Sequence, residues 1–326
     1  MPVYNTGKHL KTCLNSILNQ TETNWELVAV NDFSSDDSLA VLQEFSDKDP
    51  RIKVLNNTKK GIIPALKTAY AVTCGEFITR MDSDDIMVPQ KLEILKNNLQ
   101  NNGSGHLATG AVSYFSEAGV GAGFQRYEEW LNGLTKDGSN FSEIYKECVI
   151  PSPNWMCFRS DFDLAEGFNA DRYPEDYDLT FRFYQSGLKV VPCSLTTHQW
   201  RDYPTRTSRT DPNYADQTFI DIKLAYFLKL HHDPSKQLLI WGAGKKGKKI
   251  AEKLTLKGIK FTWICDNPNK IGKEIYGTKL IDFNALKNFH DFQSIITVAN
   301  PTAKLGIENS FTQQQLQSMK DYFYFC

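Results

Sequence analysis

The chain has 326 residues with a formal net charge of -1, and 41% of its residues are hydrophobic and 23% charged. This is the composition of an ordinary globular protein, and the length allows one large domain or two smaller ones. A charge near zero argues against nucleic-acid binding through bulk positive charge, and no stretch is apolar enough to cross a bilayer. The seven cysteines are scattered without a CxxC pair, which argues against a zinc site or a disulfide framework and favours a reducing cytoplasm.

The first half of the chain alternates strand and helix patterns, which is typical of a largely parallel sheet covered by helices. A helix is also expected after Ser34 or Ser35, since either residue can cap its first turn. The other predicted helices lie at 8–20 and 62–72, and the predicted strands at 1–4, 26–31, 52–55 and 76–81.

Beyond residue 100 the pattern becomes less regular. We expect one continuous strand at 107–115, a helix at 126–147, a helix after Pro174 and a strand at 188–192. A long helix at 213–230 then leads into a predicted linker at 231–236, which contains a proline.

A second α/β pattern starts after this linker. A strand at 238–241, a glycine turn, a helix at 248–256 and a strand at 261–265 form a βαβ unit, and 294–299 is a later strand. The sequence therefore predicts two domains, 1–230 and a small Rossmann-like domain at 237–326.

Acidic side chains stand at three predicted strand or helix ends: Asp32, the cluster at 82–85, and the pair at 175–176. The carboxyl ends of parallel strands form the usual ligand edge of an open α/β sheet. Carboxylates one residue apart can hold a hard divalent cation, which can in turn hold a diphosphate. The alternative for 82–85 is an acidic turn that caps the next helix.

Four short motifs in order resemble one known family. They are Met-Pro-Val-Tyr-Asn at 1–5, Val-Asn-Asp-Phe-Ser-Ser-Asp at 30–36, Met-Asp-Ser-Asp-Asp at 81–85 and Pro-Glu-Asp-Tyr-Asp-Leu at 174–179. Over roughly residues 1–230 the chain resembles the family 2 glycosyltransferases. That resemblance implies a GT-A fold, an α/β domain with a mostly parallel sheet that binds a nucleotide diphosphate sugar.

The resemblance implies that the start of the chain binds the nucleotide. Tyr4 would pack against the base near Pro2 and Val3, and Asp32 would accept a hydrogen bond from a base such as uracil. The alternatives are a core aromatic for Tyr4 and a turn residue for Asp32. Family members often carry an acid at the position of Asn31, so this chain has one charge fewer there.

The family pattern also implies a metal site for Mg²⁺ or Mn²⁺. Asp84 would bind the metal directly, Asp82 would contact the ribose or the metal's water shell, and Asp85 would support them. His198 would complete the metal shell, although a lone histidine is as often structural.

Asp176 fits the catalytic base of an inverting transfer, and Glu175 is the neighbour that positions the acceptor or the base. The alternative is that both acids merely favour a helix start after Pro174. Arg201, Arg206 and Arg209 form a basic loop that could cover the diphosphate or be solvated. Trp130 and the segment 151–155 are candidates for an acceptor-facing wall or for the core.

The second domain carries a glycine motif of its own. Gly242, Gly244 and Gly247 form a G-x-G-x-x-G after a strand, and Asp266 ends the next strand, where a Rossmann fold binds ribose. A second nucleotide site is therefore one hypothesis. Glycines needed only for packing, an assembly surface and a regulatory domain are the others.

Together these patterns and the family resemblance imply a cytoplasmic, metal-dependent inverting glycosyltransferase of the hexosyltransferase type. Its donor would be a nucleotide diphosphate sugar, UDP-linked, and its acceptor a glycan or lipid-linked glycan. A role in bacterial surface polysaccharide synthesis is implied by the resemblance alone. It would bind no nucleic acid and make at most peripheral contact with the inner face of the cell membrane. The alternatives are an NAD(P)-type oxidoreductase that uses the glycine motif and a non-catalytic binding or scaffold protein.

The resemblance leads to one expectation about the start of the chain. Family members carry several apolar residues before the Pro-Val-Tyr-Asn motif, whereas only Met1 precedes Pro2 here. We therefore expect a misassigned start codon or a shortened first strand.

Overall fold

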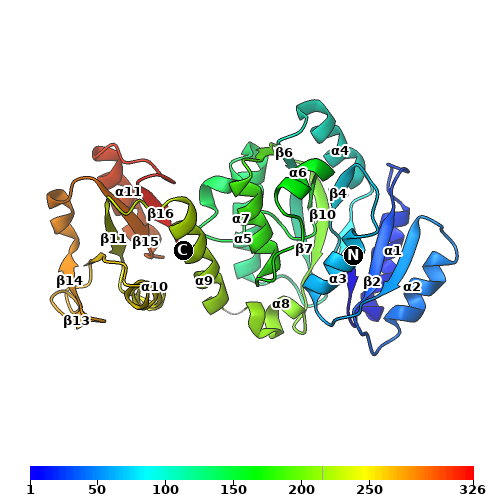
Figure 1. The fold of residues 1–326 in the computed structure, drawn as a ribbon, viewed down its shortest axis with the longest axis horizontal. Coiled ribbons are helices and arrows are strands. Elements are labelled where there is room, and N and C mark those ends of the chain that lie inside the picture. Colours follow the sequence, from blue (N-terminus) through cyan, green and yellow to red (C-terminus); the bar gives the residue numbers. More distant parts are fainter. Residues whose placement is uncertain (215) are drawn as a thin grey trace. The chain divides into compact units, whose positions relative to one another are not determined.

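The computed structural model describes residues 1–214 and 216–326, which form two compact units (Figure 1). The first unit comprises residues 1–141 and 148–214, and the second comprises residues 142–147 and the chain from 216 onward. Within the described part, no helix is both long and apolar enough to cross a membrane.

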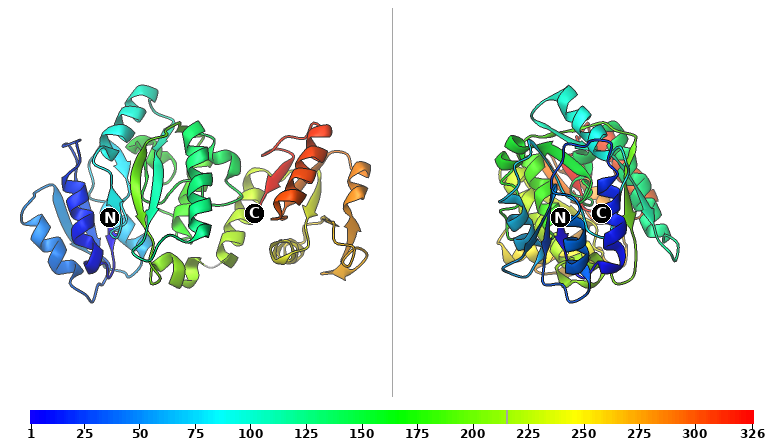
Figure 2. Two further views of the ribbon diagram at one scale, coloured as in Figure 1. Left: turned by 180° about the vertical axis from the view of Figure 1, so that it is seen from behind. Right: turned by 90° about the vertical axis from the view of Figure 1, so that its right-hand side faces the viewer.

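The first unit begins with a parallel sheet in the order β1-β2-β3. Its central strand β2 is buried throughout, because Leu27 and Ala29 face a core that includes α1 and α2, while Val28 and Val30 face α3. Helices α1 and α2, the two blue helices of Figure 2, lie side by side. The elements are β1 (Pro2–Val3), α1 (Gly7–Leu18), β2 (Leu27–Asn31), α2 (Ser38–Ser46), β3 (Ile52–Asn56) and α3 (Ile62–Tyr70).

Two further sheets complete the first unit, in the orders β4-β8-β6-β9 and β5-β10-β7. The strands are β4 (Phe77–Thr79), β5 (Ile86–Met87), β6 (His106–Thr109), β7 (Ala111–Phe115), β8 (Trp155–Phe158), β9 (Lys189–Val191) and β10 (Thr196–Arg201). The principal helices are α4 (Lys91–Asn102), α5 (Ala122–Asp137), α6 (Arg159–Leu164) and α7 (Glu175–Gln185). The predicted mixed α/β class, with sheets rich in parallel pairs and flanked by helices, is confirmed.

Two predicted elements are wrong in extent. The single strand at 107–115 is divided into β6 and β7, which belong to different sheets. The break falls at Gly110, where a Cβ atom would lie 2.3 Å from Thr197 Oγ1, so the chain can turn there only without a side chain. The helix at 126–147 is instead α5, which ends at Asp137 and is followed by Gly138 with a left-handed φ of 70°.

The second unit contains a six-stranded sheet in the order β13-β14-β12-β11-β15-β16. All of its pairs are parallel except β13 with β14. Numbered along the chain, the five parallel strands stand in the order 3-2-1-4-5. The elements are α9 (Asp216–Leu230), β11 (Gln237–Trp241), α10 (Lys245–Leu256), β12 (Thr262–Cys265), β13 (Glu274–Ile275), β14 (Thr278–Asp282), β15 (Phe292–Ile296), α11 (Pro301–Gln313) and β16 (Tyr322–Tyr324).

Aromatic side chains from the first and the last segments of the second unit pack against one another in its core. Tyr145 is fully buried and stacks on Phe325 with ring centroids 5.3 Å apart, and Phe227 of α9 packs edge-on against Phe323 at 4.9 Å. Helix α9 therefore groups with the second unit. The linker at 231–236 stays a prediction.

Candidate active site

The acidic cluster at 82–85 occupies the short connection between β4 and β5. Asp84 and Asp85 are buried, and the backbone turns tightly because Asp85 N donates to Asp82 O at 3.4 Å. Thr6, from the loop after β1, donates its hydroxyl to Ser83 Oγ at 3.0 Å. The cluster is thus held against the carboxyl end of the first sheet, the edge at which ligands bind in open α/β sheets.

Arg80 connects this cluster to the first turn of α7. Its Nε donates to Asp82 Oδ1 at 3.0 Å and its Nη1 donates to Glu175 Oε1 at 3.0 Å. Only 4% of the Arg80 side chain is exposed, so the loss of either partner would leave a buried charge uncompensated. Burial opposes ionisation of Asp82, but the positive charges of Arg80 and Arg206, with the hydrogen bond from Arg80, together hold the pKa of Asp82 below its usual value. The structure therefore brings the acids after β4 and the acids of α7 into one site.

Glu175 and Asp176 begin α7, where the helix dipole favours negative charge. Glu175 is fixed from two sides, because Tyr214 donates its hydroxyl to Oε2 at 2.6 Å while Arg80 binds Oε1. The Asp176 carboxylate accepts a bond only from its own helix, from Tyr177 N at 2.8 Å, among the hydrogen bonds described. Burial and the neighbouring charge of Glu175, opposed by Arg80, raise the pKa of Asp176 to about 7.

Asp84 faces the loop after β10. Tyr203 donates its hydroxyl to Asp84 Oδ2 at 2.9 Å, and Arg206 Nε lies 4.0 Å from the same oxygen. Arg206 also lies 4.0 Å from Asp85 Oδ2, and its guanidinium stacks over Trp200 at 5.2 Å. Burial and the charge of Asp85 raise the pKa of Asp84 to about 6, although Arg206 opposes them. Arg206 is thus the cation that partly neutralises this end of the cluster.

His198 is fully buried behind the acidic cluster. Lys91 Nζ donates to its Nδ1 at 3.1 Å, so the ring proton is on Nε2, which donates to Asp85 Oδ2 at 3.0 Å. Burial and the nearby Lys91 lower the pKa of His198 well below its usual range, which keeps the imidazole neutral. Both ring nitrogens have protein partners, so metal ligation by His198 would require one of these bonds to break.

The predicted nucleotide residues lie at the ends of β1 and β2. Asp32 is buried and accepts bonds from Gly61 N at 2.9 Å and Asn57 Nδ2 at 2.7 Å. Tyr4 is 43% exposed, and Lys60 Nζ lies 4.7 Å from its ring centroid. An exposed ring at the edge of a site can stack on a base, whereas a core aromatic would be buried. The preceding Pro2 and Val3 form β1 itself, and Val3 is buried.

Tyr173 links this region to α7. A Cβ atom on Gly61 would lie 3.5 Å from the Tyr173 hydroxyl, and the ring of Tyr173 packs edge-on against Tyr214 at 6.2 Å. Tyr214 in turn holds Glu175. A chain of contacts therefore connects Gly61, which binds Asp32, with Glu175 of α7.

The two arginines predicted to bind the diphosphate are both engaged with the protein. Arg201 Nε donates to Asp84 O at 2.7 Å, and its guanidinium lies 4.4 Å from the Phe115 ring centroid. Arg209 binds the carboxylate of Asp202 through Nε and Nη2. Among the described ion pairs of these three arginines, those to the carboxylates of Asp84 and Asp85 are made by Arg206.

The carboxylates of the acidic cluster are suitable ligands for Mg²⁺ or Mn²⁺, because these ions prefer hard oxygen ligands. In the parts of the chain that the structure describes, however, no three acidic, histidine or cysteine side chains converge into a ready-made cage. Mg²⁺ commonly binds through one or two carboxylates and completes its shell with water and substrate phosphates. The acidic cluster fits a site of that kind, in which the protein, water and the substrate phosphates each supply ligands to the ion.

Sequence reasoning missed three residues that shape the site: Arg80, Tyr203 and Tyr214. A signal existed for Arg80 alone, since it is a charged residue near the end of a strand predicted to be buried, two positions before the cluster. The tyrosines lie in irregular segments, where the sequence carries no periodic signal.

Of the two alternatives for the tryptophan of segment 151–155, an acceptor-facing wall or the core, the structure supports the core. Trp155 is 2% exposed, stacks on Phe162 at 5.6 Å and packs edge-on against Phe183 at 5.2 Å. Trp130 is half-buried on α5 and packs against Tyr127 at 5.6 Å.

In the second unit, the glycine motif joins β11 to α10. A Cβ atom on Gly242 would lie 2.7 Å from Thr297 Oγ1, and one on Gly247 would lie 2.1 Å from Gly242 O, so packing alone requires both glycines. A Cβ atom on Gly244 would meet nothing within 4 Å, and Asp266 is exposed at the end of β12.

Comparisons with known proteins agree with this geometry. The model of the family "Glycosyl transferase family 2" matches residues 1–164. The chain is 40% identical over 218 residues to glycosyltransferase GlyG of Streptococcus pneumoniae, covering 65% of this chain and 72% of GlyG. It is 38% identical over 192 residues to chondroitin synthase of Escherichia coli, covering 57% of this chain but only 26% of that enzyme.

Among solved structures the chain is similar in fold to S. aureus TarS. The TM-score is 0.53 at 18% identity, covering 78% of this chain and 42% of TarS. A structure of TarS residues 1–349 in complex with UDP gives a TM-score of 0.50 at 17% identity, covering 78% of this chain and 69% of that structure.

Proposed function

Because the chain belongs to glycosyl transferase family 2, we propose that it transfers a hexose from a nucleotide diphosphate sugar to a glycan acceptor with inversion at the anomeric carbon. The observation that carries this proposal is the Arg80 bridge, which joins Asp82 of the acidic cluster to Glu175 beside Asp176. A donor-binding group and a base must face the same reacting carbon, and the bridge supports that arrangement.

Asp176 acts as the general base in this proposal. As the acceptor oxygen forms its bond to the anomeric carbon, the hydroxyl proton passes to the Asp176 carboxylate. The bond from the anomeric carbon to the phosphate oxygen breaks, and its electron pair leaves on the nucleotide diphosphate. A pKa of about 7 suits a base that must take up a proton near neutral pH. Glu175, held by Arg80 and Tyr214, positions the first turn of α7 rather than moving a proton.

Asp84, with Asp82 nearby, would hold a divalent cation, Mg²⁺ or Mn²⁺. Such an ion offsets the charge that develops on the departing diphosphate. The raised pKa of Asp84 supports this assignment, because carboxylates that repel one another in a buried cluster are stabilised by a bound cation. His198 is assigned a supporting role here, since it holds Asp85 in place.

The nucleotide would lie across the ends of β1 and β2, with its base on Tyr4 beside Pro2 and Val3. Asp32 is the proposed hydrogen-bond acceptor for an imide N–H, which favours uracil and hence a UDP-linked donor. The fold-level likeness to TarS, which has been solved with UDP, is consistent with that choice. Arg201, Arg206 and Arg209 lie on the segment that would cover the diphosphate.

The acceptor is proposed by analogy. GlyG and chondroitin synthase are bacterial glycosyltransferases by name, and we extend to this chain a role in bacterial surface polysaccharide synthesis with a glycan or lipid-linked glycan acceptor. A cytoplasmic location with peripheral contact at the inner face of the cell membrane would bring the enzyme to a lipid-linked acceptor.

A second nucleotide site in the second unit is a separate proposal. The strand order 3-2-1-4-5 places the glycine turn after β11 at the point where the order reverses, which is where such sheets bind ligands. The open space around Gly244 favours close approach of a phosphate group there. Asp266 would then contact the ribose.

The decisive experiment is hydrolysis and transfer from a panel of nucleotide sugars with Mn²⁺. We expect turnover with at least one UDP-sugar, loss of turnover in Asp84→Ala, and full retention in Asp47→Ala, an exposed acid on the surface. Equal activity of Asp84→Ala and the wild type would exclude the proposed metal site. Turnover of a nicotinamide cofactor in place of a sugar donor would favour the oxidoreductase alternative.

A further inference from the structure

The two units carry charge of opposite sign. The second unit contains 17 lysines, no arginine and 12 acidic residues, whereas the first unit contains 20 basic and 26 acidic residues. Their formal charges are therefore +5 and -6, which nearly cancel in the net charge of -1 for the whole chain. Such an asymmetry is typical of a chain in which one part binds an anionic partner such as a nucleic acid or a membrane.

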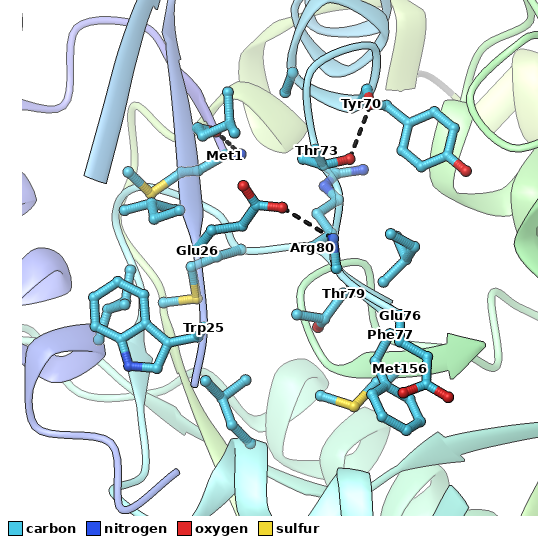
Figure 3. A pocket seen from close by; sticks show the side chains of 18 of the residues that line it. Met1, Trp25, Glu26, Tyr70, Thr73, Glu76, Phe77, Thr79, Arg80 and Met156 are labelled. Carbon is cyan, nitrogen blue, oxygen red and sulfur yellow. Dashed lines mark hydrogen bonds between the residues drawn. The ribbon is translucent and has the colours of Figure 1, made fainter. Parts of the chain in front are cut away.

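The positive charge of the second unit makes it the part of the chain that would meet such a partner. By contrast, a cavity of about 630 Å³ in the first unit is lined by three acids and two bases. Figure 3 shows two of these acids, Glu26 and Glu76, and one of the bases, Arg80. Neither the net charge of the first unit nor the lining of this cavity favours an anionic partner.

Helix α10 and the residues just after it carry the densest group of lysines in the second unit. The buried residues of the helix are those at 247, 250, 251 and 254, which lie on one side of it. Lys245, Lys248, Glu252 and Leu256 follow one another at intervals of three, four and four residues, so they lie together on the opposite side. Both lysines and Leu256 are exposed, whereas Glu252 is half-buried. The solvent face of α10 is therefore basic, with an apolar side chain in its last turn.

The acid on this face is already neutralised within the protein. Lys249 Nζ lies 3.2 Å from Glu252 Oε2, and Lys253 pairs with Asp221 of α9. Four exposed lysines take part in none of the ion pairs described for the second unit: Lys245, Lys248, Lys257 and Lys260. Together with Leu256 these four lysines form the α10 surface, whose positive charge is available to an outside partner.

Leu256 distinguishes between the kinds of anionic partner. It is 81% exposed, the largest fraction among the large hydrophobic side chains described as exposed. A bilayer accommodates an aliphatic side chain at the boundary between headgroups and acyl chains, whereas a phosphate backbone does not. The absence of arginine from the second unit agrees with this choice, because arginine is the side chain best suited to nucleic-acid phosphates.

From this charge and exposure we propose that the α10 surface binds an anionic lipid membrane, with its lysines on the headgroups and Leu256 between them. This proposal rests on the peripheral membrane contact of the proposed function and assigns that contact to one surface of the second unit. A lysine held near an anionic bilayer strengthens binding about fivefold, and salt weakens this attraction. A surface with four lysines and one apolar side chain would therefore bind reversibly and only to anionic lipid.

The experiment measures sedimentation of the full chain with lipid vesicles in the absence of any sugar donor. One set of vesicles is pure phosphatidylcholine, and the other contains about one-third phosphatidylglycerol. We expect binding to the anionic vesicles alone, and at least tenfold weaker binding when NaCl is raised from about 50 to about 300 mM. Equal binding to both kinds of vesicle would overturn the proposal.

A triple variant tests the surface. Lys248→Gln, Lys257→Gln and Lys260→Gln together should weaken binding to the anionic vesicles about 100-fold. Leu256→Ser should weaken it about fivefold without lowering the melting temperature, because the side chain is exposed. An affinity for a short DNA duplex equal to that for the anionic vesicles would mean that the surface binds polyanions in general, which would overturn the proposal.

The matched control removes the same charge elsewhere in the second unit. Lys273, Lys279 and Lys287 are also exposed, and they lie in or beside β13, β14 and the segment after β14. Their joint replacement by glutamine should weaken vesicle binding less than about fivefold, since it leaves the α10 surface intact. An equal loss in the two triple variants would show that only total charge matters and would overturn the proposal.

Donor hydrolysis with Mn²⁺ separates this proposal from sugar transfer. Both triple variants should hydrolyse the donor at the wild-type rate, because none of these lysines lies in the candidate active site. Hydrolysis without vesicle binding would overturn the membrane assignment and leave sugar transfer in place. Vesicle binding without hydrolysis would contradict sugar transfer and support the assignment of the α10 surface.

Discussion

The guanidinium of Arg80 lies 3.0 Å from the carboxylate of Glu175, although the two residues are 95 positions apart in the sequence. The same guanidinium binds Asp82 at 3.0 Å. Because guanidinium is planar and its donors are fixed in direction, it sets the spacing of its two partners more strictly than a lysine could. The acidic cluster and the first turn of α7 therefore share one rigid connection.

Replacement of Arg80 by methionine should damage both stability and turnover. The change leaves the buried carboxylates of Asp82 and Glu175 without their cation, and loss of one partner of a buried pair typically costs about 3–5 kcal/mol. We expect a comparable fall in the free energy of unfolding, measured by urea titration.

The double variant Arg80→Met with Glu175→Gln separates charge from geometry. It removes one of the uncompensated charges, so it should recover part of the stability but not the turnover, because the fixed spacing is still lost. Arg80→Lys should keep the fold with a reduced kcat. If the double variant regained wild-type kcat, Arg80 would have no positioning role.

Asp176→Asn should abolish most of the chemistry without affecting donor binding. The amide has the shape of the carboxylate but cannot accept the proton, so kcat should fall about 10²–10⁴-fold. The dissociation constant for the donor should stay within twofold of the wild type.

Asp178 on the same helix is the matched control. It is buried and pairs with Arg182 Nε at 2.8 Å, away from the Arg80 bridge. Asp178→Asn should therefore lower the melting temperature and leave kcat largely intact. A larger loss of kcat in Asp178→Asn than in Asp176→Asn would show that Asp176 is not the general base.

The rate should rise with pH through the titration of Asp176. Burial and the negative charge of Glu175 raise the pKa of Asp176 to about 7, and the positive charge of Arg80 opposes them. The other titratable groups near this carboxyl are Asp82 and Tyr214. Only the carboxylate can act as base, so kcat/KM should climb tenfold per pH unit below about pH 7 and level off above it. A profile that is flat from pH 5 to pH 8 would contradict this role.

The same pKa has the opposite effect on stability. A carboxyl group whose pKa is higher in the folded than in the unfolded state stabilises the fold while it is protonated, and this contribution is lost as the pH rises through about 7. Asp176→Asn should therefore be at least as stable as the wild type at pH 8, as judged by urea titration. A clear loss of stability at pH 8 would mean that the charged carboxylate has a partner that stabilises it.

The sequence predicts the overall class, and it shows that acidic clusters stand at the ends of elements, because both depend on local patterns. The order of strands and helices follows from apolar periodicity, and the clusters at 82–85 and 175–176 stand at element ends that the same periodicity locates. The family resemblance adds which of these acids act together.

The features of the fold and of the site that the sequence does not predict depend on contacts between distant segments. Residues 107–115 look like one strand, and the break falls at Gly110, where the packing of Thr197 leaves no room for a side chain. Trp155 looks suited to a sugar face, and only the packing of Phe162 and Phe183 makes it a core residue. No local pattern predicts that Arg80 meets Glu175. Propensity and periodicity contain no information on such pairs.

Arg206 provides a test of the cation site that does not depend on turnover. It lies 4.0 Å from both Asp84 Oδ2 and Asp85 Oδ2, and it opposes the rise in the pKa of Asp84. Arg206→Met removes this compensation, so without a divalent cation the variant should lose about 1–2 kcal/mol of stability. A cation bound by the same carboxylates would then relieve more repulsion than in the wild type. The increase in melting temperature on adding Mn²⁺, measured against a sample in EDTA, should be larger for Arg206→Met. An equal or smaller increase would show that Mn²⁺ does not bind where Arg206 faces Asp84, and that the metal site must be sought elsewhere.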